Sequence, residues 1–86
     1  MVKVDWSRKA VKQLLSIDAK YRKPISEKVN KLTNFPAVDL DIKKLQMGDS
    51  QFRMRVGNYR VIFQIVEGTP VICTIQEVKR RTTATY

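Results

Sequence analysis

The stretch from Gln51 to Gln64 constrains the fold most strongly, because two alternating runs flank the dipeptide Gly57-Asn58. This arrangement is typical of a β-hairpin with a two-residue turn, in which both turn residues tolerate a positive φ. The turn fixes the register of the two strands. The predicted cross-strand pairs are Val56 with Tyr59, Arg55 with Arg60, Met54 with Val61, Arg53 with Ile62, and Phe52 with Phe63. One face of the hairpin is then apolar, and the other carries arginines.

The arginine face contains a like-charged pair, because Arg55 lies opposite Arg60 in this register. Like charges directly opposite each other destabilise a sheet. Either both side chains extend into water as part of a solvated face, or they gather positive charge for an anion. The second interpretation is favoured, because solvated faces usually mix signs and no acid lies in the middle of the hairpin. Guanidinium groups bind phosphate through paired hydrogen bonds, so the face predicts a phosphodiester site. Its candidate residues are Arg53, Arg55, Arg60 and, from the end of the following strand, Arg80.

The size and charge of the chain limit what it can be. With 86 residues, it is expected to form one domain, residues 1–86, around a single core. It has 17 Lys and Arg against 8 Asp and Glu, a formal net charge of +9, which points to a polyanionic partner. No apolar run is long enough for a membrane span, and the alternating N-terminus does not resemble a signal peptide. We therefore expect a cytoplasmic protein that does not bind membranes.

Several kinds of chemistry are excluded by composition. The chain has no histidine, so it has neither a Ser-His nor a Cys-His nucleophile pair. Its three glycines are isolated, so there is no glycine-rich phosphate loop. The single cysteine, Cys73, falls on the predicted core face and is expected to be a buried apolar residue. No cofactor and no metal site are predicted, and any catalysis must use Arg, Lys, Tyr, Glu or Asp.

The remaining segments complete an α+β fold. Residues 2–6 alternate as a short strand, and two amphipathic helices follow, with apolar positions at 10, 11, 14 and 15 and then from 21 to 32. Residues 42–45 are weakly strand-like, and residues 70–78 form a further strand after a turn at 67–69. A three-residue turn would place Cys73 opposite Phe63 and Gln76 opposite Arg60, with Glu77 on the core side. The predicted fold is an N-terminal strand and an antiparallel helix hairpin packed on one face of an antiparallel sheet.

The block Arg53-Met54-Arg55-Val56-Gly57-Asn58-Tyr59-Arg60-Val61-Ile62-Phe63, preceded by Leu45, resembles the RelE/ParE toxin superfamily. Members are small basic bacterial toxins with the same order of elements, a RelE-like or microbial-RNase-like fold. The resemblance covers nearly the whole chain. RelE-like members are mRNA endonucleases that act in the A site of the 30S ribosomal subunit. There the 2′-hydroxyl attacks the scissile phosphate, and translation is inhibited.

The RelE-like branch is indicated by residues outside the hairpin. That branch has an arginine after the last strand and a tyrosine six residues later, and here Arg80 and Tyr86 fill these positions. The resemblance therefore implies a metal-independent endoribonuclease, the toxin of a type II toxin–antitoxin system. The implied catalytic residues are Arg53, Arg55, Arg60, Arg80 and Tyr86, with Lys43, Lys44, Lys79 and Arg81 as RNA contacts. The implied partners are an acidic cognate antitoxin, the ribosome and mRNA.

One departure and two alternatives follow from the same residues. Relatives have a lysine base where this chain has Arg55, and arginine does not deprotonate readily. The general base is then water, an RNA group or the ribosome, and Arg55 orients the nucleophile. The main alternative is a ParE-like DNA gyrase inhibitor without nuclease activity, because the hairpin alone fits either branch. A non-catalytic RNA-binding domain is the third interpretation.

Overall fold

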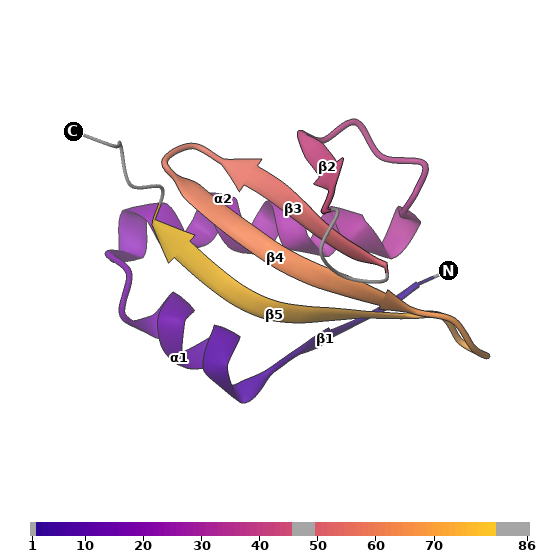
Figure 1. Cartoon of the computed structure of the whole chain (residues 1–86). Helices are drawn as coiled ribbons and strands as arrows, with labels where there is room; N and C mark the ends of the chain where they lie inside the picture. Colours follow the sequence, from indigo (N-terminus) through magenta and orange to yellow (C-terminus); the bar gives the residue numbers. More distant parts are fainter. Residues whose placement is uncertain (1, 46–49, 81–86) are drawn as a thin grey trace.

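The structure is a computed structural model that describes residues 2–45 and 50–80. It is a five-stranded sheet with two helices, and the strand order is β1-β5-β4-β3-β2. The elements in chain order are β1 (Lys3–Trp6), α1 (Arg8–Leu15), α2 (Ala19–Asn30), the 3-10 turn η1 (Lys31–Asn34), β2 (Ile42–Lys44), β3 (Gln51–Val56), β4 (Tyr59–Val66) and β5 (Ile72–Arg80). Figure 1 shows α2 running behind β3 and β4, and α1 beside β5. The predicted α+β fold is confirmed.

The pairing of β1 differs from the purely antiparallel sheet that we expected. β1 lies parallel to β5, with Lys3 opposite Ile72 and Trp6 opposite Ile75, so the sheet is mixed. A parallel pair needs a long crossover, and here the connection from β1 to β5 contains every other element. Pairing between strands so far apart in the chain leaves no local pattern in the sequence.

The helices begin where the sequence offers caps. Ser7 caps α1, since its hydroxyl oxygen accepts a hydrogen bond from the backbone N–H of Ala10 at 3.1 Å. Asp18 caps α2 in the same way through the N–H of Lys20 at 3.2 Å. The buried stripe of α1 is narrower than predicted, because Ala10 is fully buried while Leu15 is 63% exposed.

The central hairpin has the predicted register at every position. All five predicted pairs are present, and Gln51 with Gln64 extends the ladder. The turn at Gly57-Asn58 is confirmed, and of its two residues only Gly57 has a positive φ, at 57°. A positive φ at the first central position alone is typical of a type II′ turn, which matches the twist of the flanking strands.

The register of β4 with β5 corrects our prediction. The connection spans residues 67–71 rather than 67–69, and Phe63 lies opposite Ile75 instead of Cys73. A register shift between Ile62 and Phe63 then leaves Gln76 as the extra residue of a β-bulge. A bulge reverses the alternation of side chains beyond it. Glu77 therefore lies opposite Ile62 on the face without helices, and not on the core side as predicted.

One hydrophobic core joins the helices to one face of the sheet. Ala10 from α1, and Ile25 and Val29 from α2, belong to the same buried cluster as the strand residues. The strand contribution is Met54, Val56, Val61, Phe63, Ile65, Cys73, Ile75 and Val78. Both helices therefore cover the same face. The opposite face, which we call the open face, carries residues from the three central strands: Gln51, Arg53, Arg55, Arg60, Ile62, Gln64, Thr74, Gln76, Glu77 and Lys79.

Candidate nucleic-acid interface

A row of three cations crosses the open face near the β3–β4 turn. Arg55, Arg60 and Lys79 are directly opposite one another on β3, β4 and β5. Opposed side chains on a sheet have Cβ atoms about 5 Å apart, so three like charges are held close together. Arg55 and Arg60 are both exposed. We call these three residues the cation row.

A second group of basic residues extends the cation row towards β2. Lys43 lies opposite Arg53, which precedes Arg55 by two residues on β3 and faces the same side. A groove of about 410 Å³ runs over this region and is lined by Lys43, Lys44, Leu45, Arg53, Arg55 and Arg60. None of these six residues is acidic. The predicted basic residues of β2, β3 and β4 therefore share one groove.

Arg53 differs from the other arginines of the groove, because it is only 8% exposed. Its Nη1 lies 3.5 Å from Oδ1 of Asp41, an ion pair that fixes one side of the guanidinium. Alternation in the sequence indicated the face on which Arg53 lies but not its burial. Asp41 also contributes its backbone carbonyl, which accepts a hydrogen bond from the N–H of Arg55 at 3.0 Å. The loop before β2 thus braces β3 under the groove.

The bulge in β5 decides which basic residue joins the cation row. Because the alternation reverses at Gln76, Lys79 lies opposite Arg60, whereas Arg80 lies opposite Tyr59. Our expectation that Gln76 would lie opposite Arg60 was therefore wrong. Arg80 is exposed at the end of β5, on the side of the sheet to which Tyr59 belongs. Our expectation that Arg80 would share a face with Arg53, Arg55 and Arg60 was therefore wrong, because the bulge puts Lys79 in that place. Arg81 and Tyr86 lie outside the described residues.

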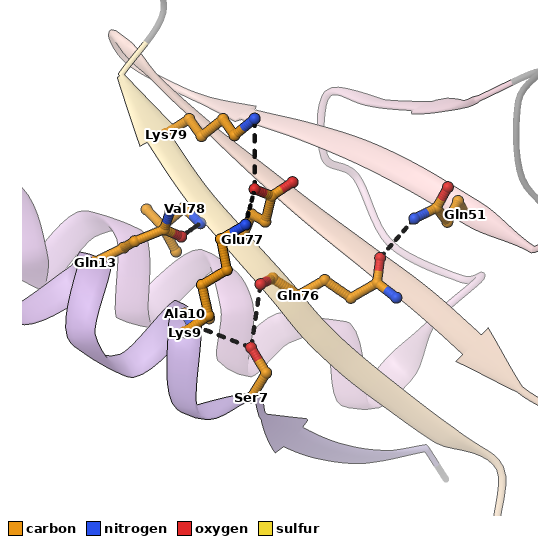
Figure 2. A network of polar contacts seen from close by, with 9 residues as sticks. All are labelled: Ser7, Lys9, Ala10, Gln13, Gln51, Gln76, Glu77, Val78 and Lys79. Carbon is orange, nitrogen blue, oxygen red and sulfur yellow. Dashed lines mark hydrogen bonds and ion pairs between the residues drawn. The ribbon is translucent and has the colours of Figure 1, made fainter.

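Helix α1 and its cap Ser7 hold the bulge through three hydrogen bonds, and Figure 2 shows the two made by the Ser7 hydroxyl and by Gln13. The N–H of Ser7 donates to the carbonyl of Ile75 at 2.9 Å, and the Ser7 hydroxyl donates to the carbonyl of Gln76 at 3.1 Å. The Gln13 side-chain oxygen accepts from the N–H of Val78 at 2.7 Å. A bulge disrupts the ladder and frees backbone groups, so these contacts stabilise it.

Glu77 places one negative charge beside the cation row. Its Oε1 lies 2.8 Å from Nζ of Lys9 and 3.4 Å from Nζ of Lys79 (Figure 2). The hydrogen bond from Lys9 lowers the pKa of this carboxyl, with a smaller contribution from Lys79 and some opposition from burial. Alternation in the sequence placed Glu77 on the wrong face, although the sequence contained a signal for the bulge. Two polar residues separate the core residues Ile75 and Val78, which breaks the period of two and indicates a bulge.

Two further observations concern the thiol and the possible metal ligands of the described residues. Burial raises the pKa of the Cys73 thiol to about 12, so it stays protonated and unreactive, as its predicted position on the core face implied. Within residues 2–45 and 50–80, no three His, Cys, Asp or Glu side chains are grouped as a metal site requires. In the same ranges, no helix has the length and apolar character to cross a bilayer.

Comparison with known proteins identifies related toxins. A family model described as "ParE toxin of type II toxin-antitoxin system, parDE" matches residues 4–83. Among solved structures, the chain is 26% identical to a protein in the archaeal RelE–RelB complex from Pyrococcus horikoshii OT3, with a TM-score of 0.78 and coverage of 96% of this chain and 98% of that one. A RelB–RelE complex from Methanococcus jannaschii matches at 28% identity and TM-score 0.69, with 88% of each chain covered.

The isolated E. coli RelE toxin has the same fold, with a TM-score of 0.80 at 15% identity over 96% of this chain and 87% of that one. No curated protein sequence matches the chain. The fold is therefore shared well beyond the range in which sequence identity is informative.

Proposed function

The chain belongs to the ParE toxin family of type II toxin–antitoxin systems, within the RelE/ParE superfamily, and we propose that within this superfamily it acts as a ribosome-dependent mRNA endonuclease. The observation that carries the proposal is the cation row together with its acid-free groove. The relatives at 26% and 28% identity, which belong to complexes named RelE–RelB and RelB–RelE, support the RelE branch.

The proposed reaction uses a nucleophile that the RNA supplies. The 2′-oxygen of one nucleotide forms a bond with the adjacent phosphorus while the bond to the 5′-oxygen of the next nucleotide breaks. The 2′-hydroxyl loses a proton, the 5′-oxygen gains one, and the products are a cyclic phosphate and a 5′-hydroxyl. Negative charge develops on the phosphoryl oxygens, where cations held in place contribute most to the rate. Because the attacking group belongs to the substrate, the reaction needs no metal-activated water.

The cation row and Arg53 suit different parts of this reaction. Arg60 is the central residue of the row, and we assign it to the phosphoryl oxygens. Arg53 is held by Asp41 and largely buried, so its guanidinium is already oriented before RNA binds. Arg55 lies on the exposed side of the same groove and is assigned to orienting the 2′-hydroxyl. Lys43, Lys44 and Lys79 add attraction for the backbone.

The arginines of the groove and the nearby Glu77 are not suited to remove the 2′-hydroxyl proton. Arginine stays protonated in proteins. Glu77 is on the same face, but its lowered pKa makes its carboxylate a weak base. We therefore place the proton acceptor outside the chain, in water, the RNA or the ribosome. Such a site cleaves free RNA slowly, which explains a requirement for the ribosome.

The assignments at the end of the chain rest on the superfamily resemblance. Arg80 is proposed to stabilise the leaving 5′-oxygen, Tyr86 to stack on a base of the A-site codon, and Arg81 to contact the RNA backbone. A cognate antitoxin of acidic character is the proposed partner. The net charge of +9 and the RelB antitoxins in complex with the related toxins support it.

The proposal is tested by adding the purified protein to translating ribosomes and mapping the mRNA ends. We expect cuts at fixed positions within codons, 2′,3′-cyclic phosphate ends, and loss of both with Arg60→Ala and with Arg80→Ala. Intact mRNA together with stalled gyrase–DNA complexes would contradict it. RNA binding without any cyclic phosphate ends would instead identify a non-catalytic RNA-binding domain.

A ParE-like gyrase inhibitor is the second candidate, because the matching family model carries the ParE description. This function needs a binding surface but no reaction at phosphorus. It predicts that gyrase supercoiling activity falls in the presence of the protein and that ribosome-bound mRNA stays intact. Measuring both activities with one preparation separates the two candidates.

A further inference from the structure

Three glutamine side chains form a hydrogen-bonded row across the open face. They come from adjacent strands, Gln51 from β3, Gln64 from β4 and Gln76 from β5. Nε2 of Gln51 donates to Oε1 of Gln76 at 2.6 Å, and Nε2 of Gln76 donates to Oε1 of Gln64 at 3.1 Å. Figure 2 shows Gln76 and Gln51 pointing towards each other across the sheet. We call these three residues the amide row.

The amide row and the cation row lie at opposite ends of the same face. Along β3 the open-face residues are Arg55, Arg53 and Gln51, and along β4 they are Arg60, Ile62 and Gln64. Four strand residues span about 13 Å at roughly 3.3 Å each, which gives the separation of the two rows. The half-exposed Ile62 lies between them. A single strand of nucleic acid that places a phosphate on the cation row can therefore reach the amide row with a neighbouring base.

The bulge completes the amide row. Gln51 and Gln64 lie opposite each other in the regular ladder, whereas Gln76 is the extra residue of β5. Bulges re-aim side chains, and this one directs Gln76 onto both other amides. The backbone carbonyl of Gln76 accepts a hydrogen bond from the Ser7 hydroxyl, so both the backbone and the side chain of Gln76 are held in place. One structural feature thus sets both rows, since the same bulge brings Lys79 opposite Arg60.

The chemistry of the amide row fits the edge of a base. An amide offers two N–H donors and two acceptor lone pairs, and Gln76 uses one of each within the row. One donor and one acceptor position of the Gln76 amide thus remain for a further partner. Adenine presents the complementary pair, and glutamine binds it through two hydrogen bonds. Proteins that read single-stranded RNA commonly bind unstacked bases by such edges.

We propose that the amide row binds the edge of an unstacked RNA base near the scissile phosphate and gives the toxin a preference for adenine there. The inference rests on the proposed function, which brings RNA to the open face. It extends that function from backbone contacts, which are independent of sequence, to a contact that selects sequence. A row that only braced the sheet would affect stability and leave base preference unchanged.

The test measures binding to short RNA oligomers that differ at one position and carry 2′-O-methyl groups to prevent cleavage. For the wild-type protein we expect affinity for adenine about tenfold above that for uracil, the size typical of a good two-bond base contact. Gln76→Met keeps the length of the side chain and removes its hydrogen bonds. We expect it to abolish the preference while leaving the salt dependence of binding unchanged.

Two further variants keep the result interpretable. Gln51→Met alters the row without touching the bulge and is expected to weaken the preference as well. Thr74→Val changes a neighbour of the row on the same face, opposite Gln64, and is expected to keep the preference. Equal affinity of the wild type for all four bases, or an unchanged preference in both methionine variants, would overturn the inference. Because the oligomers cannot react, this outcome is independent of whether the ribosome assay detects cleavage.

Discussion

On the helix side of the β3–β4 hairpin, Met54 lies opposite Val61 and both are fully buried. On the open face, one position nearer the β3–β4 turn, Arg55 lies opposite Arg60 and both are exposed. The first pair stabilises the sheet through burial of apolar surface, and the second opposes pairing through charge repulsion. The same ladder therefore carries a stabilising apolar pair on one face and an exposed pair of like charges on the other. Substitutions on the two faces are expected to affect different properties.

The largest effect on stability is expected on the core face. Phe63 is fully buried, with its ring centroid 5.4 Å from that of Phe52 and 5.7 Å from that of Phe35. We expect Phe63→Ala to lower the free energy of unfolding by about 3–5 kcal/mol. Denaturant unfolding measures this, with Val66→Ala, at a 43% exposed position of the same strand, as the control. A loss for Phe63→Ala no larger than for the control would contradict the assigned core face.

The second largest effect on stability is expected at the bulge, where the alternation of β5 side chains between the two faces reverses. Gln13→Leu removes the acceptor of the Val78 N–H, and we expect a loss of about 1–3 kcal/mol from the unsatisfied donor. Hydrogen exchange at the Val78 amide should become faster. Gln13→Glu keeps an acceptor oxygen and serves as the matched control. Equal exchange in both variants would show that α1 does not hold the bulge.

The acid beside the cation row gives a pH-dependent effect. The hydrogen bond from Lys9 lowers the pKa of Glu77 below its ordinary value of 4.5 in the folded state. This contribution to stability is therefore present above about pH 4.5 and is lost as the pH falls through the folded-state pKa. We expect Glu77→Gln to cost roughly 0.2–1 kcal/mol at neutral pH and nothing at low pH. Unfolding measured from pH 7 to pH 2 checks the difference, and a constant difference would contradict the assignment.

The smallest effect on stability is expected from relief of the like-charged pair, and it has the opposite sign. We expect Arg55→Gln to raise the free energy of unfolding by roughly 0.2–1 kcal/mol, because the repulsion from Arg60 is removed. Lys23→Gln removes the same charge from an exposed position on α2 and controls for net charge. The gain should shrink in high salt, and a gain no larger than that of Lys23→Gln would contradict the repulsion.

The sequence predicted local features of the fold and missed those that depend on distant contacts. The β3–β4 hairpin was predictable because the turn dipeptide and the alternation lie within fourteen neighbouring residues. The register of β5 was predicted wrongly, because the two polar residues between Ile75 and Val78, which indicate a bulge, were not recognised. The contact that holds this bulge comes from Ser7, which lies 69 residues away in the chain. The parallel pairing of β1 with β5 was not predicted either, because the two strands are far apart in the chain.

In the candidate site too, features set by neighbouring residues were predicted and features set by distant contacts were not. Alternation placed Arg53, Arg55 and Arg60 on one face correctly, because these residues belong to the hairpin. It did not indicate that Arg53 is buried against Asp41, since alternation carries no information about depth. Glu77 was assigned to the wrong face because the bulge was not recognised. The catalytic roles of all these residues stay predictions.

The central claim is that Arg55 and Arg60 lie opposite each other because RNA binds there, at the expense of stability. Arg60→Gln tests it when unfolding and cleavage of ribosome-bound mRNA are measured on one preparation. We predict a free energy of unfolding equal to or above that of the wild type, together with a fall in the cleavage rate of about a hundredfold or more. Wild-type cleavage by this variant, or a loss of activity that only follows a loss of stability, would contradict the account.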